Sequence, residues 1–363
     1  MRFLKSKFFW LIFLIFQIGF NQILKHFPAE VENYYSNGVF TQMSVGLRFV
    51  FGKIPFSVGD CGYFLLIVFV FRWIYLCYKN NKSRAGNIFF PIMKFLSIGY
   101  FLFHILWGYN YYRVPLATKM GLKVDFDHAD LVVFTKKLIS ESNRIQFAIT
   151  GNVNAKVVVP HSMGSLLQMG TSGYENLQKQ HDYFAYRHPA IKASLFSKPL
   201  SYMGFGGYLN PFTIEAQVND CLPKYVIPMT ACHEMAHQIG FASESECNFI
   251  GFLAATNATD LYMQYSGYSF ALRYCLAVLE REHVADFKSL YETINAGVLS
   301  NFAESESFWK RHESWVEQGF KVFYDRFLKV NNQGDGLQSY GRFLNLLINY
   351  DKQGFDRKIT LVP

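Results

Sequence analysis

Three long apolar runs occupy the first third of the chain, and polar positions become frequent after them. The runs cover residues 8–24, 58–78 and 88–108. Each is close to the roughly 20 residues that an α-helix needs to cross a bilayer. Three such runs so close together favour membrane spans over buried core helices. The pattern therefore predicts a membrane region over residues 1–112 with three transmembrane helices.

The first run also fits a second interpretation. Its basic start, MRFLKSK, is typical of a secretory signal peptide as well as of a membrane anchor. The residues after it, NQILKHFPAE, contain no small-x-small cleavage site. We therefore expect the run to remain as an uncleaved anchor.

Basic residues are distributed unevenly around the three runs and predict an orientation. Three precede the first run and three more lie in the link over residues 79–87, whereas Glu30 and Glu32 offset those of the link over residues 25–55. Because lysine and arginine accumulate in cytoplasmic loops, the amino terminus and the 79–87 link are predicted to be cytoplasmic. The expected location is the inner membrane, crossed several times, with everything after residue 112 on the outer, periplasmic side. The basic residues used are Arg2, Lys5, Lys7, Lys79, Lys82 and Arg84.

Composition supports a protein that is partly membrane and partly water-soluble. The chain is 51% hydrophobic and 18% aromatic, with a mean hydropathy of +0.08. These values are too apolar for an ordinary soluble protein and too polar for a bundle that is membrane throughout. The net charge of +8 lies largely beside the apolar runs, so the bilayer is an expected partner and nucleic acid is not. Few charges lie inside the runs beyond Arg72 and Lys94, which disfavours a transporter.

Residues 113–363 are predicted to form one α+β domain, mainly helical with a small sheet. The glycine-rich segment over residues 201–219 gives way to an alternating strand over 213–219. Helical patterns are predicted over residues 127–147, 270–280, 302–327 and 340–350.

The six cysteines carry little information about function. None has CxxC spacing, and we interpret them as small buried thiols. A disulfide on the outer side is the alternative, and the sequence does not pair its cysteines.

The stretch CHEMAHQIG contains the strongest chemical pattern. His233 and His237 are four residues apart, so on a helix both imidazoles face the same point. Two such imidazoles suit a zinc ion. Glu234 lies beside that point, where its carboxylate can take a proton from a metal-bound water. This HExxH arrangement is typical of zinc hydrolases.

A catalytic zinc ion commonly has a third protein ligand. Gly240 is expected to end the first helix in a left-handed conformation, and Ser243 to cap a second helix that runs to residue 257. Glu246 has capping-box spacing from Ser243 and so has a structural role, whereas Glu244 has none as clear. We expect Glu244 as the third ligand, with Glu246 as the alternative. For both, an ordinary acidic residue at a helix amino terminus is the competing interpretation.

HEMAH followed by a glutamate on the next helix resembles the gluzincin branch of the zincin metallopeptidases. The residues ESECN at 244–248 are similar to the ExxAD signature of integral-membrane gluzincins, including the CAAX-processing type. This resemblance implies Glu244 as a zinc ligand and Asn248, where aspartate is usual, as a residue that supports the ligands. Six residues separate His237 from Glu244, fewer than in most gluzincins. HExxHxxG also resembles the metzincins, but Ser243 stands where that branch has a histidine.

Four segments resemble a bacterial membrane family of unknown function that is grouped with the zincin peptidases. That resemblance implies amino-terminal spans followed by one HExxH domain, and it implies no substrate. The segments are PFSVGD at 55–60, GYLNPFTIEAQVN at 207–219, CHEMAHQIGFASESECNF at 232–249 and YSGY at 265–268.

Weaker candidates surround this pattern. The strand over 213–219 is expected to be an edge strand onto which a substrate peptide adds as a further strand. Glu215, on it, is interpreted as an exposed residue or as a partner for a substrate amine. Tyr265 and Tyr268 are candidates for stabilising an oxyanion. Three histidines that fit no ligand spacing are interpreted as surface or packing residues: His161, His181 and His188.

Two functions of different classes follow from the sequence. The first is a membrane-anchored, zinc-dependent metallopeptidase that hydrolyses a peptide or protein substrate. In it, His233, His237 and Glu244 bind Zn²⁺ and Glu234 is the general base. The second is a non-catalytic membrane protein that keeps the zincin fold for binding or sensing. The intact Glu234 favours the first function, and the short spacing to Glu244 favours the second if that carboxylate does not reach the imidazoles.

Overall fold

The computed structural model describes residues 8–79, 85–331 and 340–354. Of the basic residues that predict the orientation, Arg2, Lys5, Lys7, Lys82 and Arg84 lie outside the described residues. We refer to residues 113–331 and 340–354 as the body of the molecule.

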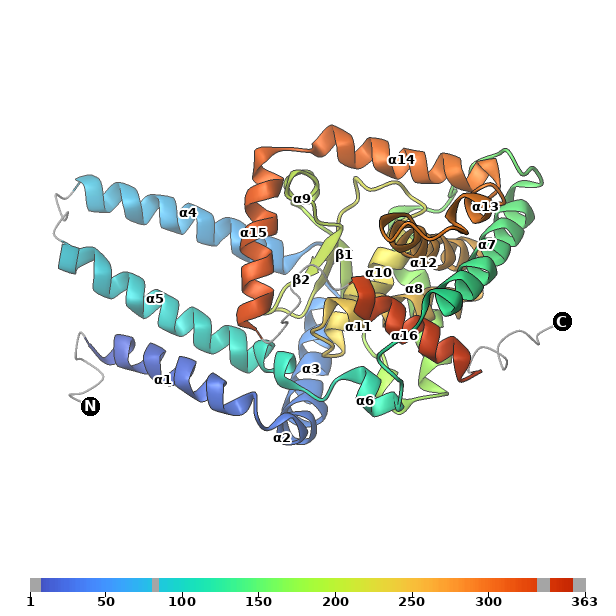
Figure 1. Cartoon of the computed structure of the whole chain (residues 1–363). Coiled ribbons are helices and arrows are strands. Elements are labelled where there is room, and N and C mark those ends of the chain that lie inside the picture. Colours follow the sequence, from blue (N-terminus) through green and yellow to red (C-terminus); the bar gives the residue numbers. More distant parts are fainter. Residues whose placement is uncertain (1–7, 80–84, 332–339, 355–363) are drawn as a thin grey trace.

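Three long helices project from one side of the body. They are α1 (Phe9–Leu24), α4 (Val58–Lys79) and α5 (Ala85–Leu106). The first residue of α1, the last of α4 and the first of α5 all lie at the end far from the body (Figure 1). These three helix ends therefore lie on the same side of the molecule.

Two of these helices are long and apolar enough to cross a membrane, namely α4 and the part of α5 over Ile88–Leu106. The second and third predicted spans are thus confirmed as helices of that kind. Helix α1 has 16 residues, which correspond to about 24 Å. It meets the same standard only together with Pro28–Phe51, which is bent away from it by 99°. The first span stays a prediction.

The segment after α1, which we call the link (residues 25–57), folds onto the body. It forms α2 (Pro28–Glu30), the π-helix η2 (Val31–Phe40) and α3 (Thr41–Phe51). Glu32 is buried and pairs with Arg113 at 2.8 Å and Lys119 at 2.6 Å. The link is therefore part of the folded core and is not a free loop between the first two predicted spans.

The body is mainly helical, with a short sheet at its centre (Figure 1). The predicted helix over 302–327 is wrong in one respect, because the chain breaks at Glu313 and Ser314. The Ser314 hydroxyl accepts a hydrogen bond from the N–H of Glu317 and so begins a new helix. The helices are α6 (Leu116–Met120), α7 (His128–Thr150), α8 (Met163–Gln178), α9 (Ser197–Met203), α10 (Ile227–Gln238), α11 (Glu244–Thr256), α12 (Leu261–Arg281), α13 (Phe287–Tyr291), α14 (Ala296–His312), α15 (Trp315–Val330) and α16 (Tyr340–Lys352), with 3₁₀ turns η3 (Gly108–Tyr112) and η4 (Asp182–Phe184).

The sheet has the order β1-β3-β2, with β1 parallel and β2 antiparallel to β3. Its strands are β1 (Ile191–Ala193), β2 (Gly207–Leu209) and β3 (Ala216–Val218). The predicted strand over 213–219 exists as β3, but the prediction that it is an edge strand is wrong. It lies in the centre, between the two edge strands β1 and β2.

Helices α10 and α11 pack in the middle of the body. Ala231, Cys232, Met235 and Ala236 on α10 are fully buried. A Cβ added at Gly251 of α11 would lie 3.0 Å from the backbone nitrogen of His233. The absence of a side chain at residue 251 therefore allows the two helices to approach closely.

Buried charges fix the start of α4 to the sheet. Glu215 is fully buried, and its carboxylate accepts hydrogen bonds from the N–H groups of Val58 at 3.1 Å and Gly59 at 2.6 Å. It also pairs with Lys192 at 2.5 Å. A carboxylate is favourable at a helix amino terminus, where N–H groups lack partners. Both interpretations of Glu215, as exposed or as a partner for a substrate, are therefore wrong.

All six cysteines are free thiols, and Cys232, Cys247 and Cys275 are buried. The six cysteines form no disulfide, so the interpretation as thiols is confirmed, but Cys61, Cys77 and Cys221 are only partly buried.

Candidate metal centre

Helix α10 presents His233 and His237 on one face, with the centres of their rings 4.9 Å apart. The helix contains Pro228 in its first turn, a position where the missing N–H has no cost. It ends before Gly240, which has a φ of +89° as predicted. The N–H of Gly240 bonds to the carbonyl of His237 at 2.9 Å, so the chain reverses directly after the second histidine.

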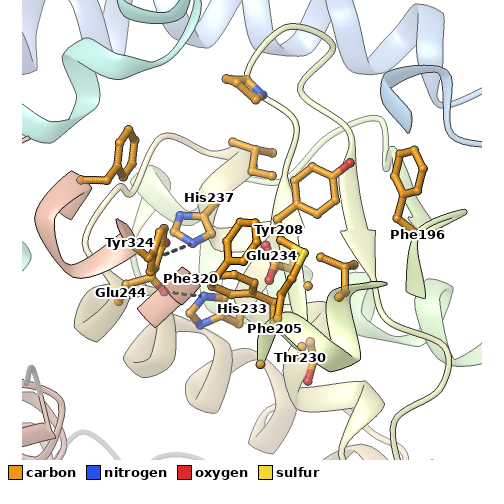
Figure 2. Close-up of a pocket in the computed structure, with 18 of the residues that line it drawn as sticks. Phe196, Phe205, Tyr208, Thr230, His233, Glu234, His237, Glu244, Phe320 and Tyr324 are labelled. Atoms are coloured by element: carbon orange, nitrogen blue, oxygen red, sulfur yellow. Dashed lines mark hydrogen bonds and ion pairs between the residues drawn. The ribbon is translucent and has the colours of Figure 1, made fainter. Parts of the chain in front are cut away.

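This reversal brings Glu244, the first residue of α11, to the two imidazoles. One carboxylate oxygen is 3.2 Å from Nε2 of His233, and the other is 3.7 Å from Nε2 of His237 (Figure 2). The six-residue connection is therefore long enough for Glu244 to reach both histidines.

Glu246 lies elsewhere. Its carboxylate accepts a hydrogen bond from the N–H of Leu116 at 2.6 Å, and Ser243 makes no side-chain cap. The predicted capping box is wrong because this buried carboxylate satisfies the start of α6 instead. Of the two glutamates considered as third ligand, only Glu244 faces the imidazoles.

Each imidazole is fixed by a hydrogen bond at its Nδ1 atom, while its Nε2 atom faces Glu244. Nδ1 of His233 is 2.8 Å from Oδ1 of Asn248, and Nδ1 of His237 is 2.8 Å from the carbonyl oxygen of Phe241. Both partners are oxygen acceptors, so each Nδ1 donates a proton to its partner, and each Nε2 is the nitrogen that faces Glu244. Asn248 thus lies where the resemblance places it, behind a histidine.

Glu234 is 4% exposed, and its Oε2 atom has no hydrogen-bond partner among the described residues. Burial raises the pKa of Glu234 to about 8; the nearby His233 opposes this rise and Glu244 adds to it. The ligand atoms of Glu234 and the two histidines lie within 4.8 Å of one another. A buried carboxylate without a partner is costly, and a cation beside it would remove that cost.

The protonation of the other three groups also indicates a place for a cation. Burial lowers the pKa of His237 to about 4. Burial acts the same way on His233, but the hydrogen bond to Glu244 and the charges of Glu234 and Glu244 outweigh it and raise this pKa to about 9. Burial would raise the pKa of Glu244, yet the two histidines lower it to about 2. A proton therefore bridges His233 and Glu244. Two imidazole nitrogens and a carboxylate are the donor set that zinc prefers, so these residues fit the ion.

Two aromatic residues that the sequence analysis missed complete the site. The Tyr324 hydroxyl on α15 donates to Glu244 at 2.6 Å (Figure 2). The indole N–H of Trp107, after α5, lies 3.4 Å from the carbonyl oxygen of His237. Neither belongs to a local motif: Tyr324 follows Glu244 by 80 residues. No pattern in a single sequence connects them to the histidines.

The predicted oxyanion candidates lie away from the site. Tyr265 is fully buried, and its hydroxyl donates to Asn301 at 2.9 Å. Tyr268 packs against Phe252. Neither lines the cavity at the metal centre, so this prediction is wrong.

The three histidines interpreted as surface or packing residues are confirmed as such. His161 packs against Tyr262, His181 stacks on Tyr183, and His188 contacts the ring of Phe49.

A cavity of about 1120 Å³ opens onto the imidazoles and Glu234. Its walls come from α10, α11, β2 and α15 of the body and from the apolar helices α4 and α5. The candidate metal centre and the two apolar helices therefore share one cavity.

Residues 35–348 match the model of a family described as a protein of unknown function, DUF3810. The chain belongs to this family. The DUF3810 match includes α4, α5 and every residue of the candidate metal centre, so these two apolar helices and the site lie within one family unit. No curated protein and no solved structure matches the chain. The DUF3810 description carries no activity.

Proposed function

We propose that this protein is a membrane-anchored, zinc-dependent metallopeptidase. The observation that supports it is the convergence of His233, His237 and Glu244 on one point, with the unpartnered carboxylate of Glu234 beside it. Three protein ligands of this kind, with a position left for water, are typical of catalytic zinc sites. The likeness of HEMAH and ESECN to gluzincins supports the same function.

Different residues would bind the zinc ion and transfer the proton. His233, His237 and Glu244 would bind the ion, while Asn248 and the Phe241 carbonyl keep the imidazoles in place. A bound zinc ion supplies a Lewis acid that lowers the pKa of its water to about 7. These contacts fix the tautomers in advance, so binding requires little rearrangement.

Glu234 would act as the general base. Its carboxylate is buried on the cavity side of α10, beside the two imidazoles. A carboxylate within hydrogen-bond reach of the reacting water can accept a proton and return it. In peptide hydrolysis, Glu234 takes a proton from the attacking water and gives it to the amine nitrogen that leaves.

Strand β2 would position the substrate. It is one of the two edge strands of the sheet, and the one that lines the cavity, so one side of its backbone is available to pair with an added strand. A Cβ at Gly207 would lie 2.6 Å from a carboxylate oxygen of Glu234. A peptide paired with β2 would therefore pass close to the general base.

The alternative is a non-catalytic membrane protein for binding or sensing. The sequence favoured this alternative only if the short spacing between His237 and Glu244 kept the carboxylate from reaching the imidazoles. Since the Glu244 carboxylate lies within 3.7 Å of both Nε2 atoms, that spacing does not favour the alternative.

Zinc analysis of the purified full chain tests the proposal. We expect about one zinc ion per chain, lost in His233→Ala and in Glu244→Ala. The matched control is Glu246→Gln, which should keep the metal. Glu234→Gln should keep zinc and lose hydrolysis of a mixed peptide library. A zinc-free chain after reconstitution would refute the proposal and favour the non-catalytic alternative. Hydrolysis that persists in Glu234→Gln would refute the role of Glu234 as the general base.

A further inference from the structure

We infer that the substrate is an apolar polypeptide segment that reaches the metal centre from the bilayer, between α4 and α5. This inference rests on the proposed peptidase function and adds to it a substrate class and a route. It follows from the position, the chemistry and the attachment of the cavity walls.

The cavity extends along the membrane helices. Leu66 and Ile67 of α4 and Phe103 of α5 line it together with the two histidines. Leu66 is eight residues after the start of α4 at Val58, which places it about 12 Å along the helix. The wall therefore reaches into the apolar part of the span and does not stop at its end.

Both membrane helices leave this region accessible to lipid. No residue in the apolar window of α4 is buried within the described structure, and only 11% of the corresponding window of α5 is buried. The two helices extend separately from the body, and α15 crosses near the ends at which they join it (Figure 1). A chain embedded in the bilayer could thus enter between α4 and α5.

The chemistry of the walls suits apolar side chains. Helix α15 contributes Phe320, Phe323 and Phe327, and α9 contributes Leu200 and Met203. The cavity, at about 1120 Å³, exceeds the roughly 300–1,000 Å³ typical of small-molecule pockets. It has room for several side chains of a peptide. Polar side chains placed against these walls would lose their hydrogen bonds to water without replacement.

The attachment of α4 aligns this route with the edge strand. The Tyr208 hydroxyl of β2 donates to Asp60 of α4, and the rings of Tyr208 and Tyr63 lie 6.2 Å apart. Asp60 is itself held by the Ser194 hydroxyl at 2.9 Å. A segment that leaves the membrane along α4 would therefore meet β2 directly, beside Glu234.

Photo-crosslinking of the full chain in phosphatidylcholine vesicles tests the route without depending on turnover. The chain carries Glu234→Gln, so a bound peptide is not cleaved. One probe is a benzophenone-labelled peptide of about 20 residues rich in leucine and alanine, long enough to enter the bilayer. The second has the same length and label but is rich in serine and glutamine. Adducts are located by mass spectrometry.

We expect the apolar peptide to label the cavity walls on α4, α5 and α15. Leu66→Trp, which narrows the cavity where α4 lines it, should reduce this labelling about tenfold, since it displaces the burial of roughly one large apolar side chain. The matched control is Leu65→Trp. Leu65 is the neighbouring residue, 64% exposed and outside the cavity lining, so labelling should be unchanged.

The outcomes separate this inference from the proposed function. Equal labelling of the walls by the polar peptide, or apolar adducts confined to the outward faces of α4 and α5, would overturn the inference. So would labelling of the walls that added free lipid abolishes, because the occupant would then be an acyl chain. Glu234-dependent hydrolysis without labelling of the cavity walls would contradict the inferred route and leave the peptidase function standing. Labelling of the walls without any hydrolysis by the wild-type chain would contradict the peptidase function and leave a binding site for apolar peptides.

Discussion

The Tyr324 hydroxyl donates a hydrogen bond of 2.6 Å to the same carboxylate of Glu244 that faces both imidazoles. Helix α15 is thereby attached to the candidate metal centre. A carboxylate ligand that accepts such a bond is held in one orientation. The four predictions below concern this contact, the support of His233, and the buried charges around the site.

Tyr324→Phe should weaken zinc binding by roughly tenfold, because outer partners of metal ligands typically contribute 10- to 100-fold to affinity. Competition with a chelator measures the change. The control is Tyr291→Phe, because the side chain of Tyr291 on α13 is exposed. This variant should bind zinc as the wild type does. An unchanged affinity in Tyr324→Phe would show that Glu244 does not need this bond.

Asn248→Ala should also lower zinc affinity, by roughly 10- to 100-fold, because His233 loses the acceptor that fixes its tautomer. Asn248→Asp keeps an acceptor oxygen at the same place and should retain the metal. Zinc titration of both variants decides the matter. Equal loss in the two variants would mean that the residue is needed for packing and not for its oxygen.

Glu32 should make the free energy of unfolding depend on pH in the acidic range. Burial alone would raise its pKa, but the hydrogen bonds and charges of Arg113 and Lys119 outweigh burial and lower this pKa from 4.5 to about 2. A folded-state pKa below the unfolded value stabilises the fold above the unfolded pKa. The contribution, of order 3 kcal/mol, is therefore present above about pH 4.5 and lost as the pH falls through about 2.

Melting of the detergent-solubilised chain, followed by tryptophan fluorescence, measures this effect. Glu32→Gln should melt at a lower temperature than the wild type at pH 7, and the difference should vanish near pH 2. Glu30→Gln changes a neighbouring exposed carboxylate and should melt like the wild type at both pH values. A pH-independent difference for Glu32→Gln would argue against the ion pairs as its cause.

Glu215→Gln should destabilise the protein by about 3 kcal/mol or more, because Lys192 keeps its charge in a buried position without a counter-charge. The effect should appear in the melting temperature and not as a selective loss of zinc from the folded chain. Asp220→Asn, at an exposed position after β3, is the control. A variant with normal stability but an altered KM for peptides would restore the idea that Glu215 contacts a substrate.

The parts of the fold and site that the sequence predicted are those set by local spacing. The four-residue interval between His233 and His237 fixes a shared helix face, and Gly240 marks the left-handed turn that brings Glu244 back. The long helix α7 and the two apolar helices α4 and α5 follow from periodicity and length. Each depends only on residues close together in the chain.

The parts that were missed depend on contacts between distant segments. Strands of three residues are too short for alternation to show which of them lie at an edge, so the central strand β3 was mistaken for an edge strand. The role of Glu215 depends on the start of α4, more than 150 residues earlier. Tyr324 reaches Glu244 only because α15 crosses the body, which no local pattern indicates.

The packing of the link has a practical consequence for obtaining this protein. Phe40 is fully buried in a small cluster with Trp107, Ile214 and Ala242, and Glu32 neutralises Arg113, whose guanidinium also binds the carbonyl of Gly240 at 2.7 Å. A fragment that begins at residue 113 would expose this cluster and loosen the turn between the two ligand-bearing helices. Expression trials should therefore retain the link, and the intact chain in detergent or lipid is the proper material for zinc analysis.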